Sequence, residues 1–151
     1  MAELQVFLDS SALFSAAYST SGGARLVLQL GEAGVISLWI GRWVLQEVEA
    51  ALERKSSRSK ASFALLLNRA RVHIGAEPDT SSIARALAVV GYLPDAQVLV
   101  EALAIGAGYF VTFDRKHLLG HLDAAQLPFP IGSAGDFLAW YRGRLFAQVG
   151  T

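Results

Sequence analysis

Four acidic residues of the chain stand beside apolar segments, where a charged side chain is costly to place: Asp9, Glu47, Asp95 and Asp114. Asp9 and Asp114 each follow a short apolar run, and Asp95 follows a proline at the entrance to an apolar segment. Crowded carboxylates repel one another unless a cation neutralises them, and hard oxygen ligands favour Mg²⁺ or Mn²⁺. Because one or two such ions can polarise a phosphodiester and activate water, the four acids suggest phosphodiester hydrolysis.

Each acid also has a structural alternative. Asp95 has the position of a helix N-cap, and Asp114 could cap a turn over residues 115–119 or pair with its basic neighbours. Glu47 lies within a helical pattern, where most glutamates face solvent. Asp9 is the hardest to explain in this way, because an acid that ends an apolar strand has few routine structural roles.

The length and composition predict one globular domain. A chain of 151 residues, 53% of them hydrophobic, can bury one sizeable core. The mean hydropathy is +0.39, but no window of about 18–20 residues is free of charge, as a membrane-spanning helix requires. The N-terminal sequence lacks the basic and apolar regions of a signal peptide, so we expect a cytoplasmic location. The chain has no cysteine, so any metal must use oxygen or imidazole ligands.

The charges balance overall but cluster locally. Thirteen basic and thirteen acidic residues cancel, which leaves no strong net field for holding polyanions. Basic residues nevertheless gather in the sequence ERKSSRSK and directly after the fourth acid. These residues are Arg54, Lys55, Arg58, Lys60, Arg115 and Lys116. The first cluster, taken by itself, is typical of a solvated surface.

Changes in hydrophobic period predict alternating strands and helices. The predicted strands are residues 4–8, 35–40, 72–74 and 109–113. The predicted helices are residues 24–30, 43–52, 61–70, 81–90, 96–105 and 134–145, and a further helix begins after an N-cap at Ser10 or Ser11. Residues 80–82 supply N-caps for the helix at 81–90, residues 56–59 are predicted as a loop, and residues 117–119 as a helical turn. This alternation indicates a three-layer α/β/α sandwich with a central, mainly parallel sheet. In such a sheet, ligands bind outside the carboxyl ends of the strands. Asp9 and Asp114 would be delivered there by their own strands, and Glu47 and Asp95 could join from helix starts.

Three segments together resemble a PIN domain: VFLDSSAL, VLQEVEAAL and LPDAQVLVEALAIGAGYFVTFDRKHL. The resemblance covers about residues 4–119. It consists of a D-[ST]-[NS] motif after the first strand, an acid in the helix after the second, a D-A-x-x-L-x-x-A helix start and a T-x-D strand end. The matching functional residues are Asp9, Ser10, Ser11, Glu47, Asp95, Thr112 and Asp114.

The resemblance implies a single PIN-like domain over residues 1–151 with the activity of a metal-dependent endoribonuclease. It implies the toxin of a type II toxin–antitoxin pair, with RNA as substrate, a cognate antitoxin as partner, and a homodimer. Asp9 and Asp95 would be the firmest Mg²⁺ or Mn²⁺ ligands. Glu47 and Asp114 would complete the site directly or through water.

The resemblance also implies roles for polar and basic residues. Hydroxyl groups would orient carboxylates or water by hydrogen bonding; these belong to Ser10, Ser11 and Thr112. Basic side chains would contact RNA phosphates; the candidates are Arg54, Lys55, Arg58, Arg115 and Lys116. Many PIN domains carry a further acid just after the fourth, where this chain has Arg115, Lys116 and His117. The sequence therefore predicts one firm metal position, to which a second ion could be added with substrate.

Other classes of function remain as alternatives. A non-catalytic PIN-like module would bind RNA or a protein through the same fold without cleaving it. A haloacid-dehalogenase-like phosphatase needs a second aspartate two positions after the first, where this chain has Ser11. Dinucleotide binding of the Rossmann type has no support, because no G-x-G-x-x-G motif follows the first strand.

Overall fold

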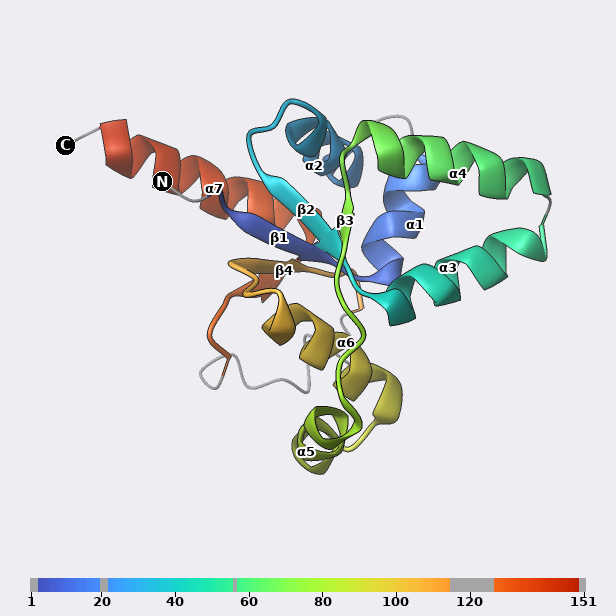
Figure 1. Cartoon of the computed structure of the whole chain (residues 1–151). Helices are drawn as coiled ribbons and strands as arrows, with labels where there is room; N and C mark the ends of the chain where they lie inside the picture. The colour runs from blue at the N-terminus through green and yellow to red at the C-terminus, as the bar shows by residue number, and fades with distance from the viewer. Residues whose placement is uncertain (1–2, 20–21, 56, 115–126, 150–151) are drawn as a thin grey trace.

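The structure is a computed structural model, and it describes residues 3–19, 22–55, 57–114 and 127–149. Five short strands form one sheet in the order β3-β2-β1-β4-β5, and every pairing in it is parallel (Figure 1). The strands are β1 (Gln5–Leu8), β2 (Ser37–Ile40), β3 (His73–Ile74), β4 (Tyr109–Val111) and β5 (Ile131–Gly132). Since all strands point the same way, their carboxyl ends share one edge, as the sequence predicts.

Helices cover both faces of this sheet. They are α1 (Ser10–Tyr18), α2 (Gly23–Glu32), α3 (Arg42–Glu53), α4 (Ser57–Arg69), α5 (Thr80–Val90), α6 (Leu93–Ala104) and α7 (Ala134–Val149). α1 packs against α2 and α3, and α2 packs against α7, whereas α5 and α6 pack together on the other side (Figure 1). The predicted α/β/α sandwich with a parallel sheet is therefore confirmed.

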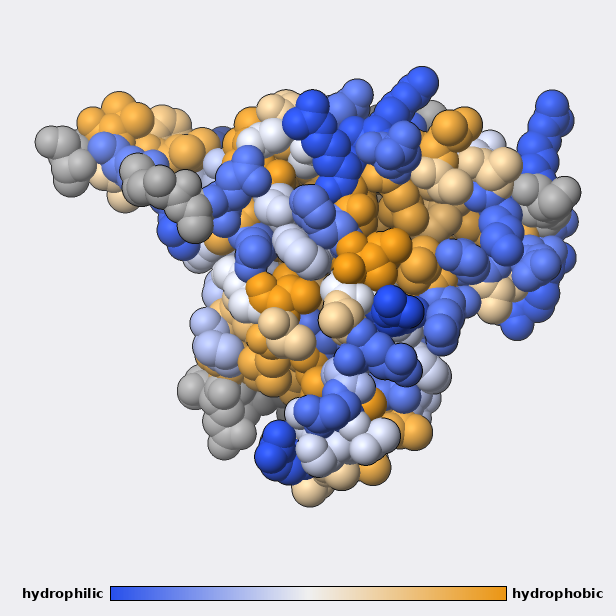
Figure 2. All heavy atoms as spheres, in the orientation of Figure 1, coloured by the Kyte–Doolittle hydropathy of each residue, from blue (hydrophilic) through white to orange (hydrophobic). Residues whose placement is uncertain are grey.

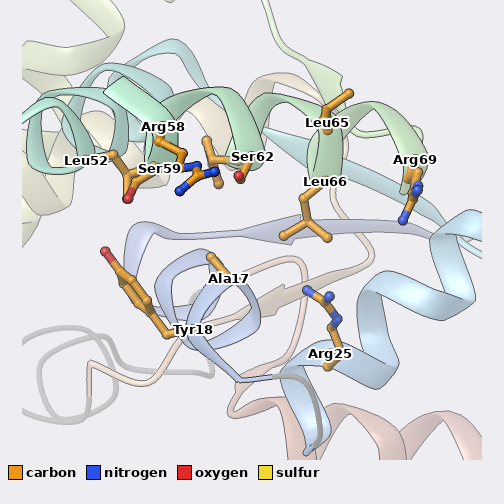
Figure 3. Close-up of a pocket in the computed structure, with 11 residues that line it drawn as sticks. Ala17, Tyr18, Arg25, Leu52, Arg58, Ser59, Ser62, Leu65, Leu66 and Arg69 are labelled. Atoms are coloured by element: carbon orange, nitrogen blue, oxygen red, sulfur yellow. The ribbon is translucent and has the colours of Figure 1, made fainter. Parts of the chain in front are cut away.

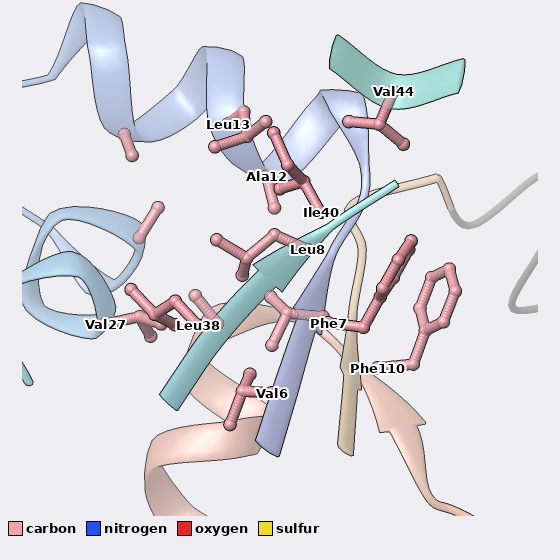
Figure 4. Close-up of a cluster of buried hydrophobic side chains, with 14 of the residues drawn as sticks. Val6, Phe7, Leu8, Ala12, Leu13, Val27, Leu38, Ile40, Val44 and Phe110 are labelled. Carbon is pink, nitrogen blue, oxygen red and sulfur yellow. The ribbon is translucent and has the colours of Figure 1, made fainter. Parts of the chain in front are cut away.

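The central strand β1 explains the position of the core. Val6 and Phe7 are fully buried and Leu8 nearly so, because side chains that alternate along β1 meet helices on both faces. Figure 4 shows Val6 and Leu8 directed toward the α1 and α2 side, and Phe7 beside Phe110 of β4. The two rings lie 5.1 Å apart between centroids. This continuous burial extends to the residue after Leu8, which is an acid.

Several element boundaries differ from the sequence predictions. Residues 57–59, predicted as a loop, form the first turn of α4. The sequence did not indicate this turn because the first buried apolar side chain of α4 comes only at Phe63. β5 was not predicted, because two residues after a proline carry no periodic signal; it forms by pairing with the edge of β4. The side chain that caps α5 is Asp79, which precedes the predicted cap at 80–82. The helical turn predicted at 117–119 lies outside the described residues.

The last helix is longer than predicted and leaves the body of the protein. α7 continues to Val149, and its C-terminal part extends beyond the sheet (Figure 1). Leu145, Phe146 and Val149 there are 44%, 67% and 84% exposed, and orange side chains mark this end of the molecule in Figure 2. None of the helices that the structure describes has the length and apolar character needed to cross a membrane.

The substitution Gly31→Ala tests how closely α2 packs against the sheet. A Cβ at Gly31 would lie 2.3 Å from Leu38 Cδ1 and 2.9 Å from the carbonyl oxygen of Ala70. We expect Gly31→Ala to lower the free energy of unfolding by about 1–3 kcal/mol, because the buried Leu38 must move. The measurement is urea unfolding, in which the midpoint should fall at an unchanged slope.

Gly143→Ala in α7 is the matched control. A Cβ at Gly143 meets no atom within 4 Å, so the gain in helix propensity should stabilise the protein by about 0.5–1 kcal/mol. Equal effects of the two substitutions would contradict the packing described for Gly31.

Candidate active site

Asp9 joins the central strand to the first helix. It follows β1 directly and is the N-cap of α1, where its Oδ1 accepts a hydrogen bond of 3.1 Å from the Ala12 backbone N–H. The predicted cap at Ser10 or Ser11 is therefore wrong, because the extended backbone that an N-cap needs is already present at the end of β1. Asp9 thus has a structural role that the sequence analysis did not expect, and it is only 4% exposed.

Two hydroxyl groups hold the Asp9 carboxylate, one from the first turn of α1 and one from the residue after β4. Ser11 Oγ donates to Oδ1 at 2.6 Å, and Thr112 Oγ1, which follows β4, donates to Oδ2. The same hydroxyls accept hydrogen bonds from the next backbone groups: Phe113 N donates to Ser11 Oγ at 2.9 Å, and Asp114 N donates to Thr112 Oγ1 at 3.0 Å. These bonds join the carboxyl ends of β1 and β4 around one acid.

Burial dominates the electrostatics of Asp9. It raises the pKa of this carboxyl above its ordinary value, and the negative charge of Asp114 raises it further. Hydrogen bonds from Ser11, Thr112 and the Ala12 N–H lower it, but they do not offset burial. A carboxylate in this position is one that a nearby cation would stabilise.

The other three acids occupy different environments. Asp114 is half-buried, and its charge acts on Asp9. Asp95 is 6% exposed in the first turn of α6, whose N-cap is Tyr92, so the alternative of Asp95 as an N-cap is wrong. Because α6 runs back toward the start of β4, its first turn is directed to the carboxyl edge of the sheet, where the helix dipole favours an acid. Glu47 is exposed on α3 beside a shallow hollow of about 260 Å³.

The fit of a metal ion to these residues is partial. In the part of the chain that the structure describes, no three acidic or histidine side chains are grouped closely enough to hold a metal ion. Mg²⁺, however, commonly binds proteins through one or two carboxylates and keeps several waters. The buried Asp9 with its neighbour Asp114 offers such a pair, and Asp95 and Glu47 do not extend it to a group of three.

Asp79 provides an internal comparison for Asp9. It caps α5 in the same way: its Oδ1 accepts from Ser81 Oγ at 2.8 Å and from the Ser82 N–H at 2.7 Å. Its carboxylate is exposed, so these hydrogen bonds lower its pKa to about 2. The local motif is shared, and burial, with a smaller contribution from the charge of Asp114, reverses the direction of the pKa shift at Asp9.

Sequence analysis missed a fifth acid, Glu101 of α6. It is 3% exposed and lies against the first turn of α3, where Oε2 accepts from the Trp43 N–H at 3.0 Å. A Cβ on Gly41 would lie 2.1 Å from this carboxyl group, so the glycine makes room for it. Burial raises the pKa of Glu101, and hydrogen bonds from the Trp43 and Arg42 backbone lower it. The sequence feature that could have indicated a buried acid here is the position of Glu101 within the apolar run AQVLVEALAI.

The predicted supporting residues are distributed unevenly. Ser11 and Thr112 contact the Asp9 carboxylate, whereas Ser10 is the half-buried first residue of α1 and is not among the described partners of that carboxylate. Of the basic candidates, Arg54 is the C-cap of α3, Lys55 Nζ lies 4.1 Å from the centroid of the Tyr18 ring, and Arg58 is exposed in α4. The remaining two, Arg115 and Lys116, lie outside the described residues.

Solved structures of known proteins share this fold. PAE2754 from Pyrobaculum aerophilum matches with a TM-score of 0.64 at 18% identity, over 93% of this chain and 98% of its own. A chain of VapBC2 from Rickettsia felis, solved bound to a DNA fragment from its promoter, has a TM-score of 0.64 at 17% identity, over 86% and 98%. VapC20 from Mycobacterium tuberculosis, a Sarcin-Ricin loop cleaving toxin, has a TM-score of 0.57 at 14% identity, over 76% and 94%.

These neighbours are PIN-domain proteins of the VapC type, so the resemblance predicted from the sequence is confirmed as a likeness of fold. No protein-family model matches the chain, and no curated protein is similar to it in sequence.

Asp9→Asn and Asp79→Asn should change stability in opposite directions. The folded-state pKa of Asp9 is raised, so its favourable contribution is complete below the unfolded pKa near 4 and is lost as pH rises through the folded pKa. In metal-free buffer at pH 7, Asp9→Asn should therefore melt above wild type, and the difference should shrink toward pH 4. Each kcal/mol corresponds to about 2–4 °C for a domain of this size.

The folded-state pKa of Asp79 is lowered to about 2, so its contribution is present above the unfolded pKa and is lost as pH falls through about 2. Asp79→Asn should therefore melt slightly below wild type at pH 7. Thermal melts of the three proteins between pH 4 and 8 check both signs. A lower melting temperature for Asp9→Asn at pH 7 would contradict the dominance of burial.

Substitutions of Glu101 test its contact with α3. Glu101→Ala leaves the Trp43 and Arg42 N–H groups without their acceptor, which should cost about 1–3 kcal/mol. Glu101→Gln keeps an acceptor oxygen and removes a buried charge, so its effect should be smaller. Urea unfolding measures both, with the exposed Glu53→Ala of α3 as control. If Glu101→Ala costs no more than Glu53→Ala, the contact does not stabilise α3.

Proposed function

We propose that this protein, which has the PIN-domain fold, is a metal-dependent endoribonuclease that hydrolyses RNA phosphodiester bonds. The observation that carries the proposal is the buried Asp9 carboxylate, held between the ends of β1 and β4 with the charge of Asp114 beside it. This position, at the carboxyl edge of a parallel sheet, is where ligands of α/β folds bind.

Asp9 and Asp114 would hold Mg²⁺ or Mn²⁺, with Asp95 and Glu47 contributing through water. The bound ion would supply a polarised phosphate and a water of lowered pKa. Ser11 and Thr112 would orient the Asp9 carboxylate, in the way that hydrogen-bonded outer groups orient metal ligands. Their backbone partners, at residues 113 and 114, would keep both hydroxyls directed at Asp9.

We further propose that the protein is the toxin of a type II toxin–antitoxin pair, inhibited by a cognate antitoxin. The neighbours support this partner, because one belongs to a VapBC complex and another is a toxin that cleaves the Sarcin-Ricin loop. A homodimer is part of the same proposal. The exposed apolar side chains of α7, Leu145, Phe146 and Val149, support it, since such surface is typical of interfaces.

A non-catalytic PIN-like module that binds RNA or a protein is the second candidate. The specific observation in its favour is that no group of three metal-ligating side chains occurs among the described residues. The two functions differ in their response to divalent ions, because only the nuclease requires them for turnover.

The test uses purified protein with single-stranded and structured RNAs in Mg²⁺, Mn²⁺ or chelator. Wild type should cleave only with metal, Asp9→Asn and Asp95→Asn should reduce the rate about 100-fold or more, and Thr112→Val should reduce it about 10–100-fold. Asp79→Asn is the matched control, because it changes an N-cap aspartate with the same local hydrogen bonds. Cleavage that survives chelation, or that Asp9→Asn leaves intact, would sink the nuclease proposal. RNA binding without any cleavage would favour the non-catalytic module.

A further inference from the structure

A second hollow lies between α1, α2 and α4, at the end of α1 opposite Asp9 (Figure 3). Its volume is about 500 Å³. Three arginines border it, Arg25 of α2 with Arg58 and Arg69 of α4. Arg58 and Arg69 belong to separate basic stretches of the sequence, and the fold brings both to the same hollow as Arg25.

Within the described residues, the arginines around this hollow have no carboxylate beside them. No acid is among the described residues that border the hollow. The one ion pair among the described residues joins Lys60 Nζ and Glu49 Oε2 at 3.8 Å, and neither residue borders the hollow. Arg25 Nη1 donates to the Ala16 carbonyl at 2.9 Å, which holds its guanidinium at the rim. Guanidinium groups stay charged at all relevant pH values and suit phosphate oxygens. Such a cluster is suited to an anion that is not part of this chain.

The spacing of the arginines favours a linear polyanion over a single small anion. Arg58 and Arg69 are eleven residues apart on α4, which corresponds to about 16 Å along a helix. One phosphate or carboxylate cannot bridge that distance. A strand with regularly repeated charges can contact both ends, with Ser59 and Ser62 as hydroxyl donors between them.

The rest of the hollow suits the uncharged parts of a nucleotide. Its floor includes Ala17, Leu52 and Leu66, which offer apolar contact to a base or ribose. Tyr18, at its edge, is 54% exposed, and Lys55 Nζ lies over its ring at 4.1 Å. Cationic side chains combined with aromatic and apolar surface are the usual means of binding single-stranded nucleic acid.

We propose that this hollow is a subsite for single-stranded RNA, in which Arg25, Arg58 and Arg69 contact backbone phosphates. α1 links it to the candidate active site, since Asp9 caps the first turn and Tyr18 ends the last, about 13 Å further along the helix. This separation is within the reach of a strand of a few nucleotides bound at both places. The inference rests on the proposed ribonuclease function and deepens it by assigning where the substrate is held.

The test measures binding separately from cleavage. A fluorescent single-stranded RNA of about 12 nucleotides is titrated with metal-free protein in chelator, and anisotropy is recorded at several salt concentrations. The double variant Arg58→Gln/Arg69→Gln should weaken binding about 10-fold or more and reduce the slope of log K against log[salt] by about 0.7 for each phosphate that the variant no longer binds. Both side chains are exposed, so folding should be unaffected, and thermal melting checks this.

Arg85→Gln is the matched control, because Arg85 is an exposed arginine of α5 outside the hollow. It should leave affinity and salt slope at the wild-type values. Equal affinity and slope for the double variant and Arg85→Gln would overturn the subsite, as would a wild type that binds no RNA. A poly-glutamate peptide is tested as a competitor of RNA. If it displaces RNA, and if its binding is weakened by Arg58→Gln/Arg69→Gln more than RNA binding is, the hollow binds an acidic protein instead.

The subsite and the nuclease proposal fail separately. If wild type binds RNA through the arginines but cleaves none with Mg²⁺ or Mn²⁺, the nuclease proposal is wrong and the subsite stands. If wild type cleaves RNA while the double variant binds it as tightly as Arg85→Gln does, the subsite is wrong and the nuclease stands.

Discussion

The candidate site depends on one buried carboxylate. Asp9 ends the central strand, caps α1 and accepts hydrogen bonds from hydroxyls on both sides, so it connects β1, α1 and β4 at one point. Burial makes the ionised form costly, and hydrogen bonds offset only part of that cost. The fold therefore keeps Asp9 where its ionised form is costly without a cation and would be stabilised by a bound one. The proposed metal binding depends on this difference.

A second buried, hydrogen-bonded carboxylate lies near the site. Glu101, also buried, receives the first N–H groups of α3, so an acid of α6 positions the helix that carries Glu47. Gly41 has no side chain that would collide with this carboxyl group. At the other end of α1, three basic side chains gather instead, those of Arg25, Arg58 and Arg69. α1 thus separates a region of buried negative charge from one of exposed positive charge, an arrangement suited to a polyanionic strand that needs a cation at one end.

Much of the fold was predictable, because strands buried on both faces and amphipathic helices leave strong periodic signals. The parallel sheet and the succession of strands and helices along the chain follow from such signals. β5 was not predictable, since two residues carry no period and exist as a strand only through pairing with β4. Glu101 and the arginine cluster were missed for a related reason. The partners of Glu101 lie 58 residues away on α3, and the three arginines come from two helices, so no local pattern connects them.

Asp9 and Asp79 show where the sequence alone stops being sufficient. Both are followed by a serine two positions later, and both cap a helix with the same local hydrogen bonds. The sequence by itself determined the local cap motif and the position of the first acid at the end of a strand. Only the tertiary structure decided that Asp9 is buried beside Asp114 while Asp79 faces solvent, because burial depends on what packs around a residue. That difference in solvation reverses the direction of the pKa shift and makes one cap a candidate metal ligand.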